Sequence, residues 1–120
     1  EVYVSYALAL MQGNYPSDAE EAARKAVEMA PGDASAWYAK GRIQRLRGHK
    51  GEALNSLKKA IELQGSLVLA RYECGMILAE MGELKAALEC FEEVLADHPE
   101  DQNAVEAKAS ILAKMEELNS

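Results

Sequence analysis

Few residues in this chain have the types and the spacing that catalysis needs. The two histidines, His49 and His98, stand in turn-like stretches far apart in the sequence. Residues 97–101, DHPED, include several metal-ligand types, but their spacing matches no motif of defined geometry. The sequence also contains no glycine-rich phosphate loop and no serine–histidine or cysteine–histidine pair that it can connect. It therefore predicts no enzyme, no metal site and no cofactor.

A basic stretch is the stronger indication of binding chemistry. It contains five basic residues and no acidic one: Lys40, Arg42, Arg45, Arg47 and Lys50. Arg42 and Arg45 are three residues apart, so in a helix they share one face. Two guanidinium groups on one face favour a carboxylate or an acidic side chain of a ligand. The alternative is that they pair with neighbouring acidic residues such as Glu73 and Glu80.

Composition and charge exclude several other classes. The formal net charge of −7 repels polyanions, so we expect no nucleic-acid binding. No apolar run has the length needed to insert into a membrane. Cys74 and Cys90 lack metal-like spacing and are expected to act as small hydrophobic residues. A reducing compartment such as the cytoplasm fits them, although two cysteines do not decide it. The chain begins with Glu1 rather than Met, which indicates a piece of a longer protein.

The elements that position these residues are predicted to be helices. Ala, Leu, Glu, Lys and Met dominate the composition, whereas β-branched and aromatic residues are sparse. Apolar spacing and turn residues place the first helix over residues 1–12. Ser17 is expected to cap the second helix, with Glu20 completing a capping box. Five further helices follow, at about residues 35–47, 51–63, 67–81, 84–96 and 102–118.

The central part of the chain contains the same residue pattern twice. The segments Ala34–Leu67 and Val68–Asp101 align with each other at a shift of 34 residues. The shift aligns the following pairs: Gly41 with Gly75, Gly48 with Gly82, Ala53 with Ala87, and Leu57 with Phe91. A period of this length is typical of stacked helical repeats.

These residues resemble the tetratricopeptide repeat family, whose unit is a 34-residue helix-turn-helix. The small position of its first helix corresponds to Ala7, Gly41, Gly75 and Ala109. The large positions around it correspond to Tyr3, Trp37, Arg71 and Val105, and to Leu10, Gln44, Leu78 and Leu112. The small and bulky positions of the second helix correspond to Ala19, Ala53 and Ala87, and to Ala23, Leu57 and Phe91. Arg71, Lys40 and Gln44 depart from the apolar residues that are usual at their positions.

The resemblance implies an all-α fold, a right-handed superhelical solenoid of antiparallel helix pairs with about seven helices. The implied units are residues 1–33, 34–67 and 68–101, followed by a C-terminal capping helix over 102–120. In that last helix, Val105, Ala109 and Leu112 share an apolar face, while Lys114 and several glutamates lie on a charged side. A polar outer face is what the end of a helical stack requires.

The resemblance also implies where a ligand binds, because the first helix of each repeat lines the concave side in this family. The predicted groove comprises Val4, Leu8, Met11, Tyr38, Arg42, Arg45, Leu69, Tyr72 and Met76. Tyrosine and arginine are typical anchors of interfaces, and methionine adapts to varied partners. We therefore expect a peptide or helix of a protein partner, with an acidic or carboxylate group. The alternative for the groove is that these side chains only pack between neighbouring helices.

Three other expectations remain open. Some family members hold a C-terminal carboxylate with lysine and asparagine, but Val4 and Leu8 occupy those positions here, which disfavours that mode. The apolar surfaces could instead serve self-association, or belong to a structural scaffold segment of a longer solenoid or multidomain protein. The chain could also be a non-catalytic module joined to an enzyme.

Overall fold

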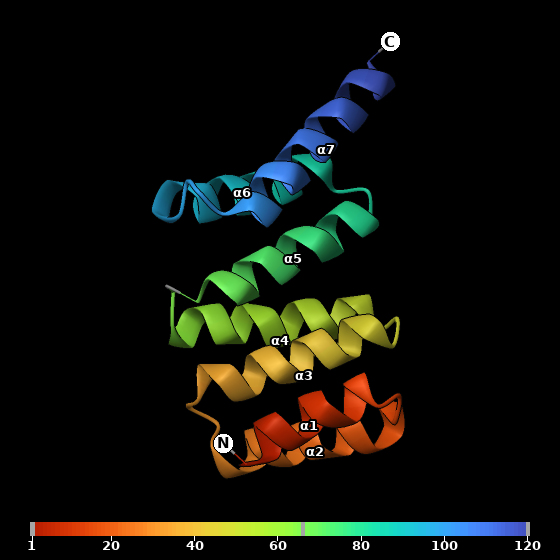
Figure 1. Cartoon of the computed structure of the whole chain (residues 1–120), viewed down its shortest axis with the longest axis vertical. Coiled ribbons are helices and arrows are strands. Elements are labelled where there is room, and N and C mark those ends of the chain that lie inside the picture. The colour runs from red at the N-terminus through yellow and green to blue at the C-terminus, as the bar shows by residue number, and fades with distance from the viewer. Residues whose placement is uncertain (1, 66, 120) are drawn as a thin grey trace. The chain divides into compact units, whose positions relative to one another are not determined.

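The structure is a computed structural model that describes residues 2–65 and 67–119. Predictions that fall on residues 1, 66 and 120 lie outside this range. The described residues form seven α-helices and no strand (Figure 1), which confirms the all-α prediction. The helices are α1 (Val2–Gln12), α2 (Pro16–Met29), α3 (Ala34–Leu46), α4 (Lys50–Leu63), α5 (Val68–Glu80), α6 (Leu84–Asp97) and α7 (Gln102–Leu118).

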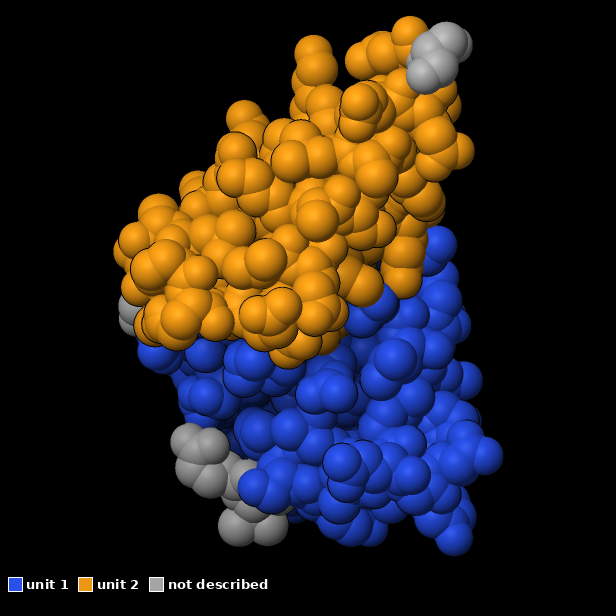
Figure 2. Space-filling model, turned by 45° about the horizontal axis from the view of Figure 1, so that its top comes forward, with its two compact units in different colours: residues 1–70 blue, residues 71–120 orange. Residues whose placement is uncertain are grey.

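The chain divides into two compact units, coloured separately in Figure 2. Unit 1, residues 1–70, contains α1 to α4 and the start of α5. In it α1 packs on α2 and α3 on α4, and α3 also contacts both α1 and α2. Unit 2, residues 71–120, contains the rest of α5 together with α6 and α7, and α6 packs on α7.

The turn within each helix pair repeats at the 34-residue period. Asn14, Gly48 and Gly82 all have a left-handed backbone, with φ values of 67°, 86° and 85°. Glycine and asparagine tolerate this conformation best, so the residue types at these positions select the turn. The first helix of each pair accordingly ends at Gln12, Leu46 and Glu80, each within one residue of the predicted bound.

Helix starts are only partly as predicted. The capping box at Ser17 is wrong, because α2 begins at Pro16 and Tyr15 precedes it without a side-chain cap. Proline suits the first helical position, since its fixed φ is helical and its missing N–H has no partner there anyway. Aspartates cap two other helices. Asp33 accepts a hydrogen bond from the Ser35 N–H at 2.9 Å, and Asp101 accepts one from the Ala104 N–H at 3.1 Å.

Close approach of paired helices depends on the small residues of the repeat. A Cβ at Gly41 would lie 2.6 Å from Leu57 Cγ, and a Cβ at Gly75 would lie 2.8 Å from Phe91 Cζ. Leu57 and Phe91 are fully buried, so the glycines make the room that these bulky side chains fill. In the first pair the same role falls to alanines, since Ala7 packs in one cluster with Ala19, Ala22 and Ala23.

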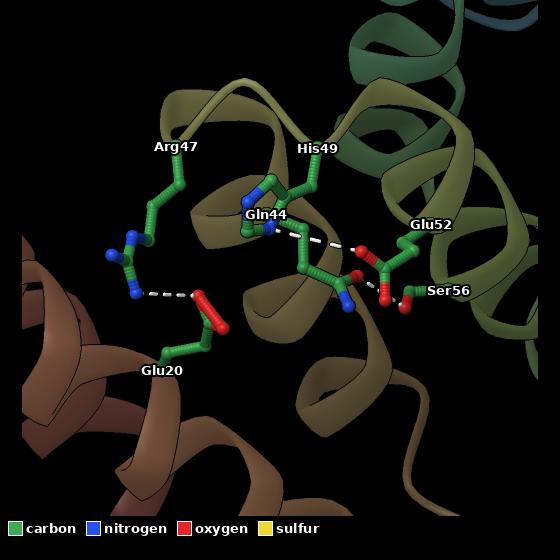
Figure 3. A network of polar contacts seen from close by, with 6 residues as sticks. All are labelled: Glu20, Gln44, Arg47, His49, Glu52 and Ser56. Atoms are coloured by element: carbon green, nitrogen blue, oxygen red, sulfur yellow. Dashed lines mark hydrogen bonds and ion pairs between the residues drawn. The ribbon is translucent and has the colours of Figure 1, made fainter.

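Two of the unusual polar residues at repeat positions have partners (Figure 3 shows the first). The amide oxygen of Gln44 accepts a hydrogen bond from the Ser56 hydroxyl at 2.7 Å, and the exposed fractions of these residues are only 7% and 4%. Arg71 forms an ion pair with Glu93 at 2.9 Å. The lost apolar packing at these positions is thus compensated by polar contacts.

The buried face of α7 differs from the predicted one. Val105 and Leu112 are 41% and 45% exposed, and Ala109 is exposed as well. Ala104 and Ile111 are buried instead, and Ile111 shares a cluster with Phe91 and Ala87 of α6. The physical reason is that α7 rests on the preceding helix pair through that face. The face carrying the repeat positions would need a second helix of its own, and the described residues supply none.

Candidate functional site

Unit 1 contains a hollow of about 130 Å³ between α1 and α3. Its lining comes from one face of each helix: Leu8, Met11 and Gln12 from α1, and Arg42, Ile43 and Leu46 from α3. Spacings of three and four residues place each set on one face. Because a cavity of roughly 150 Å³ accommodates a benzene-sized group, this hollow has room for one apolar side chain.

Arg42 is the charged residue of this hollow. Its side chain is exposed, and among residues 2–65 and 67–119 it has no ion-pair or hydrogen-bond partner. The exposed guanidinium group beside an apolar surface is therefore available to a carboxylate of a ligand. Arg45, predicted to act with it, is half-buried, does not line the hollow and makes a contact of its own.

Three other predicted groove residues of unit 1 also lie outside this lining. Tyr38 is only 8% exposed, so it belongs to the core more than to a binding surface. Val4 is half-buried and packs on the cluster of Ala26, Val27 and Ala36. Leu69 is exposed.

Unit 2 contains a second hollow of about 290 Å³. The predicted residues Tyr72 and Met76 line it from α5, and Phe91 adds an aromatic ring from α6. Tyr72 and Phe91 meet edge to face, with ring centroids 5.6 Å apart and an interplanar angle of 63°. This geometry is favourable for aromatic pairs and fixes the position of Tyr72.

The α7 side of the second hollow is lined by the following residues: Asn103, Glu106, Ala107, Ser110, Ile111 and Lys114. Lys114 was expected on the outer charged side, and the structure places it on the lining of this hollow instead. A spacing of 103, 107, 110 and 114 was visible in the sequence as a helical face. Only the observed rotation of α7 shows that this face, and not that of Val105, adjoins α5 and α6.

A third hollow, of about 490 Å³, is polar and lies against α2, α3 and α4. Figure 3 shows one contact between its lining residues, the ion pair between Arg47 and Glu20 at 2.8 Å. Arg24 likewise pairs with Glu21 and Glu28 on its own helix. The charges of this surface are thus largely matched within the protein, which makes it a weaker candidate for binding.

The two histidines that were candidates for catalysis each lie near an acidic residue. His49 lies 3.7 Å from Glu52, and His98 lies 4.0 Å from Glu100; both histidines are about half exposed in turns. Within the described part of the chain, no group of three or more histidine, cysteine or acidic side chains has the geometry to hold a metal ion. No described helix combines the length and apolar character required to cross a membrane.

These features define a helical repeat protein in which bulky residues of one helix fill spaces beside glycine and alanine of its partner. A family model of the tetratricopeptide repeat matches residues 7–68 and 72–117, and the chain belongs to that family. This confirms the resemblance that the residues suggested.

Comparisons with individual proteins agree with this assignment. The chain is 29% identical over 109 residues, 91% of its length, to DnaJ homolog subfamily C member 3 of Bos taurus. It spans only about a fifth (21%) of that curated relative. The first TPR of Spaghetti (RPAP3), bound to the HSP90 peptide SRMEEVD, has a TM-score of 0.90 and 16% identity, covering 95% of this chain and 90% of that one.

A further solved structure is the second TPR domain of human RPAP3 in complex with the HSP70 peptide SGPTIEEVD. Its TM-score is 0.84 and its identity 21%, and the alignment covers 91% of each chain. At these identities the likeness establishes the fold. Both of those domains are solved with a bound peptide, and this chain shares their fold.

Proposed function

We propose that this chain is a non-catalytic interaction module that binds a peptide or helix of a protein partner. The observation that carries the proposal is Arg42, which has no partner among the described residues, at the apolar hollow of Leu8, Met11 and Leu46. Such a site suits an apolar side chain next to an acidic group. One groove of this kind typically gives a micromolar dissociation constant, about −8 kcal/mol.

The bound peptides of the two RPAP3 domains support an acidic ligand, since both end in the residues EEVD. The mode of recognition we propose differs from a clamp for the terminal carboxylate. Val4 and Leu8 stand where such a clamp uses lysine and asparagine, and neither side chain donates a hydrogen bond. The acidic group of the ligand is therefore a carboxylate that Arg42 binds, and no lysine–asparagine clamp holds it.

Selection from a random peptide library displayed on phage tests this proposal. Wild-type protein is expected to enrich peptides with an acidic residue near a leucine, isoleucine or methionine. Arg42→Gln should lose the preference for the acidic residue. Arg24→Gln is the matched control, because Arg24 is exposed on α2 and lines neither apolar hollow. Tyr38 is left unchanged, since its substitution would disturb the core. Failure of the wild type to enrich any peptide would refute the proposal.

Self-association is a second candidate, favoured by the exposed face of Val105, Ala109 and Leu112 on α7. Apolar positions at the repeat register that remain exposed could meet another copy of the chain. Sedimentation equilibrium over a wide concentration range tests it. The mass should rise with concentration for the wild type and stay at 13.1 kDa for Leu112→Lys. A wild-type mass that stays constant at 13.1 kDa removes this candidate.

A further inference from the structure

The second hollow has an ordered distribution of charge along α7. Glu106 and Lys114 both line it, and they are eight residues apart on the same helix. At 1.5 Å per residue, their backbone positions are separated by about 12 Å along the helix axis. Ala107, Ser110 and Ile111 lie between them in the sequence and line the same hollow. The wall therefore has an acidic end, a largely apolar middle and a basic end.

Both charged ends are available to a ligand. Within the described residues, Lys114 has no ion-pair or hydrogen-bond partner. Glu106 accepts one hydrogen bond, from the Gln102 side-chain amide at 3.2 Å. A carboxylate has about four acceptor positions, so this bond leaves it able to bind a cation. Lys108, the other lysine in this part of α7, differs because it pairs with Glu92 at 3.5 Å.

The spacing of these charges matches an extended peptide. Alternate residues of an extended chain point to the same side, and each residue advances about 3.3 Å. Residues i and i+4 therefore lie on one side and about 13 Å apart, close to the separation of Glu106 and Lys114. Residue i+2 points the same way, toward the apolar surface of Tyr72, Met76 and Ala107, which are half-buried.

We propose that this hollow binds an extended peptide segment with a basic, an apolar and an acidic residue at positions i, i+2 and i+4, in either chain direction. The basic residue lies at Glu106, the apolar residue on Met76 and Ala107, and the acidic residue at Lys114. Asn103 and Ser110, on the same wall, offer hydrogen bonds to the main chain of the peptide. This inference rests on the proposed function as a peptide-binding module and specifies the ligand of unit 2.

A titration with a designed peptide tests the inference by NMR on the whole chain, labelled with nitrogen-15. The probe is serine–lysine–alanine–leucine–alanine–glutamate–serine, blocked at both ends. We expect its addition to shift amide signals of α7 around Ser110. Replacing the glutamate of the peptide with glutamine should raise the dissociation constant about two- to fivefold, as for exposed ion pairs. Replacing its lysine with glutamine should do the same.

Protein variants then assign each effect to one residue. The affinity of the Lys114→Gln variant should no longer depend on the glutamate of the peptide. The affinity of the Glu106→Gln variant should no longer depend on its lysine. Lys85→Gln is the matched control, because Lys85 is exposed on α6 and lines neither apolar hollow, so both dependences should persist.

Two outcomes would overturn the inference. In one, replacing the glutamate of the peptide with glutamine weakens binding to Lys114→Gln as much as it weakens binding to the wild type. The other is the absence of α7 shifts at millimolar peptide. If signals around Arg42 shift while those of α7 do not, the proposed function stands and the inference about unit 2 fails.

Discussion

At the scale of single residues, space and hydrogen bonding decide how the paired helices fit. Gly41 and Gly75 lie opposite Leu57 and Phe91, and these two bulky side chains are fully buried. This contact could be predicted from the sequence, because the glycines and the bulky residues recur at a spacing of 34. The partner of Gln44 could not, since nothing in the sequence indicates that its amide meets Ser56.

Gly41→Ala should destabilise the protein. The new methyl group would lie 2.6 Å from Leu57 Cγ, and overpacking typically costs about 1–3 kcal/mol, partly offset by the higher helix propensity of alanine. Gly51→Ala is the control, because a methyl group added to Gly51 in α4 would meet no neighbouring element within 4 Å, so alanine there should be neutral or stabilising. Urea unfolding measures both. Equal stability of the two variants would contradict the packing described for Gly41.

The effects of substituting Gln44 and Ser56 on the free energy of unfolding should be coupled. Gln44→Leu or Ser56→Ala alone leaves a buried polar group without its partner, which costs about 1–3 kcal/mol. The double substitution removes both polar groups, so it should cost less than the sum of the two single losses. A double-mutant cycle by urea unfolding gives the coupling free energy. Additive effects would show that the hydrogen bond contributes nothing specific.

At the scale of elements, the sequence predicted where each helix lies along the chain, but it did not predict how a helix is rotated about its own axis. Turn residues and apolar spacing located the seven helices of the described residues close to their observed bounds. For α7 the sequence shows two candidate apolar faces, one with Val105 and Leu112 and one with Ala104 and Ile111. Only packing on α6 selects the second, and this selection also turns Lys114 and Ser110 toward the hollow of unit 2.

Substitutions on the two faces of α7 should therefore have unequal effects. Ile111 is 4% exposed and packs with Phe91, so Ile111→Ala should cost about 2–5 kcal/mol. Leu112→Ala, at a position 45% exposed, should cost less than about 1 kcal/mol. Thermal unfolding followed by circular dichroism compares the two. A larger loss of stability for Leu112→Ala than for Ile111→Ala would show that the face predicted from the sequence is the buried one.

At the scale of the whole molecule, the surplus of acidic residues governs behaviour in solution. The net charge of −7 at neutral pH produces an electrostatic repulsion between copies of the chain. Against this background, Arg42 and Lys114 are local exceptions, cations that lack a partner within the described residues and that each line an apolar hollow. The sequence showed the basic stretch around Arg42. It did not show which residue of that stretch would line the hollow of unit 1, because this depends on how α1 packs on α3.

Solubility should accordingly pass through a minimum near pH 4.9, the isoelectric point calculated from the sequence. As the pH falls from 7, carboxylates take up protons and the net negative charge that separates the molecules decreases toward zero. Turbidity and residual soluble protein measured between pH 3 and 8 check this. Recovery of solubility below the minimum is part of the expectation, and a monotonic decline into acid would contradict it.

The exposed repeat face of α7 gives this chain a practical use as a building unit. A grafted helix placed after α7 would meet Ala109 where α4 meets Gly41 and α6 meets Gly75. Alanine carries a methyl group that glycine lacks, so a leucine or phenylalanine aimed at that position would collide with it. In this chain α2 already packs against an alanine at the equivalent position, because its Ala23 lies in one cluster with Ala7. The template for extending this protein by design is therefore α2, the helix whose small residues match an alanine rather than a glycine.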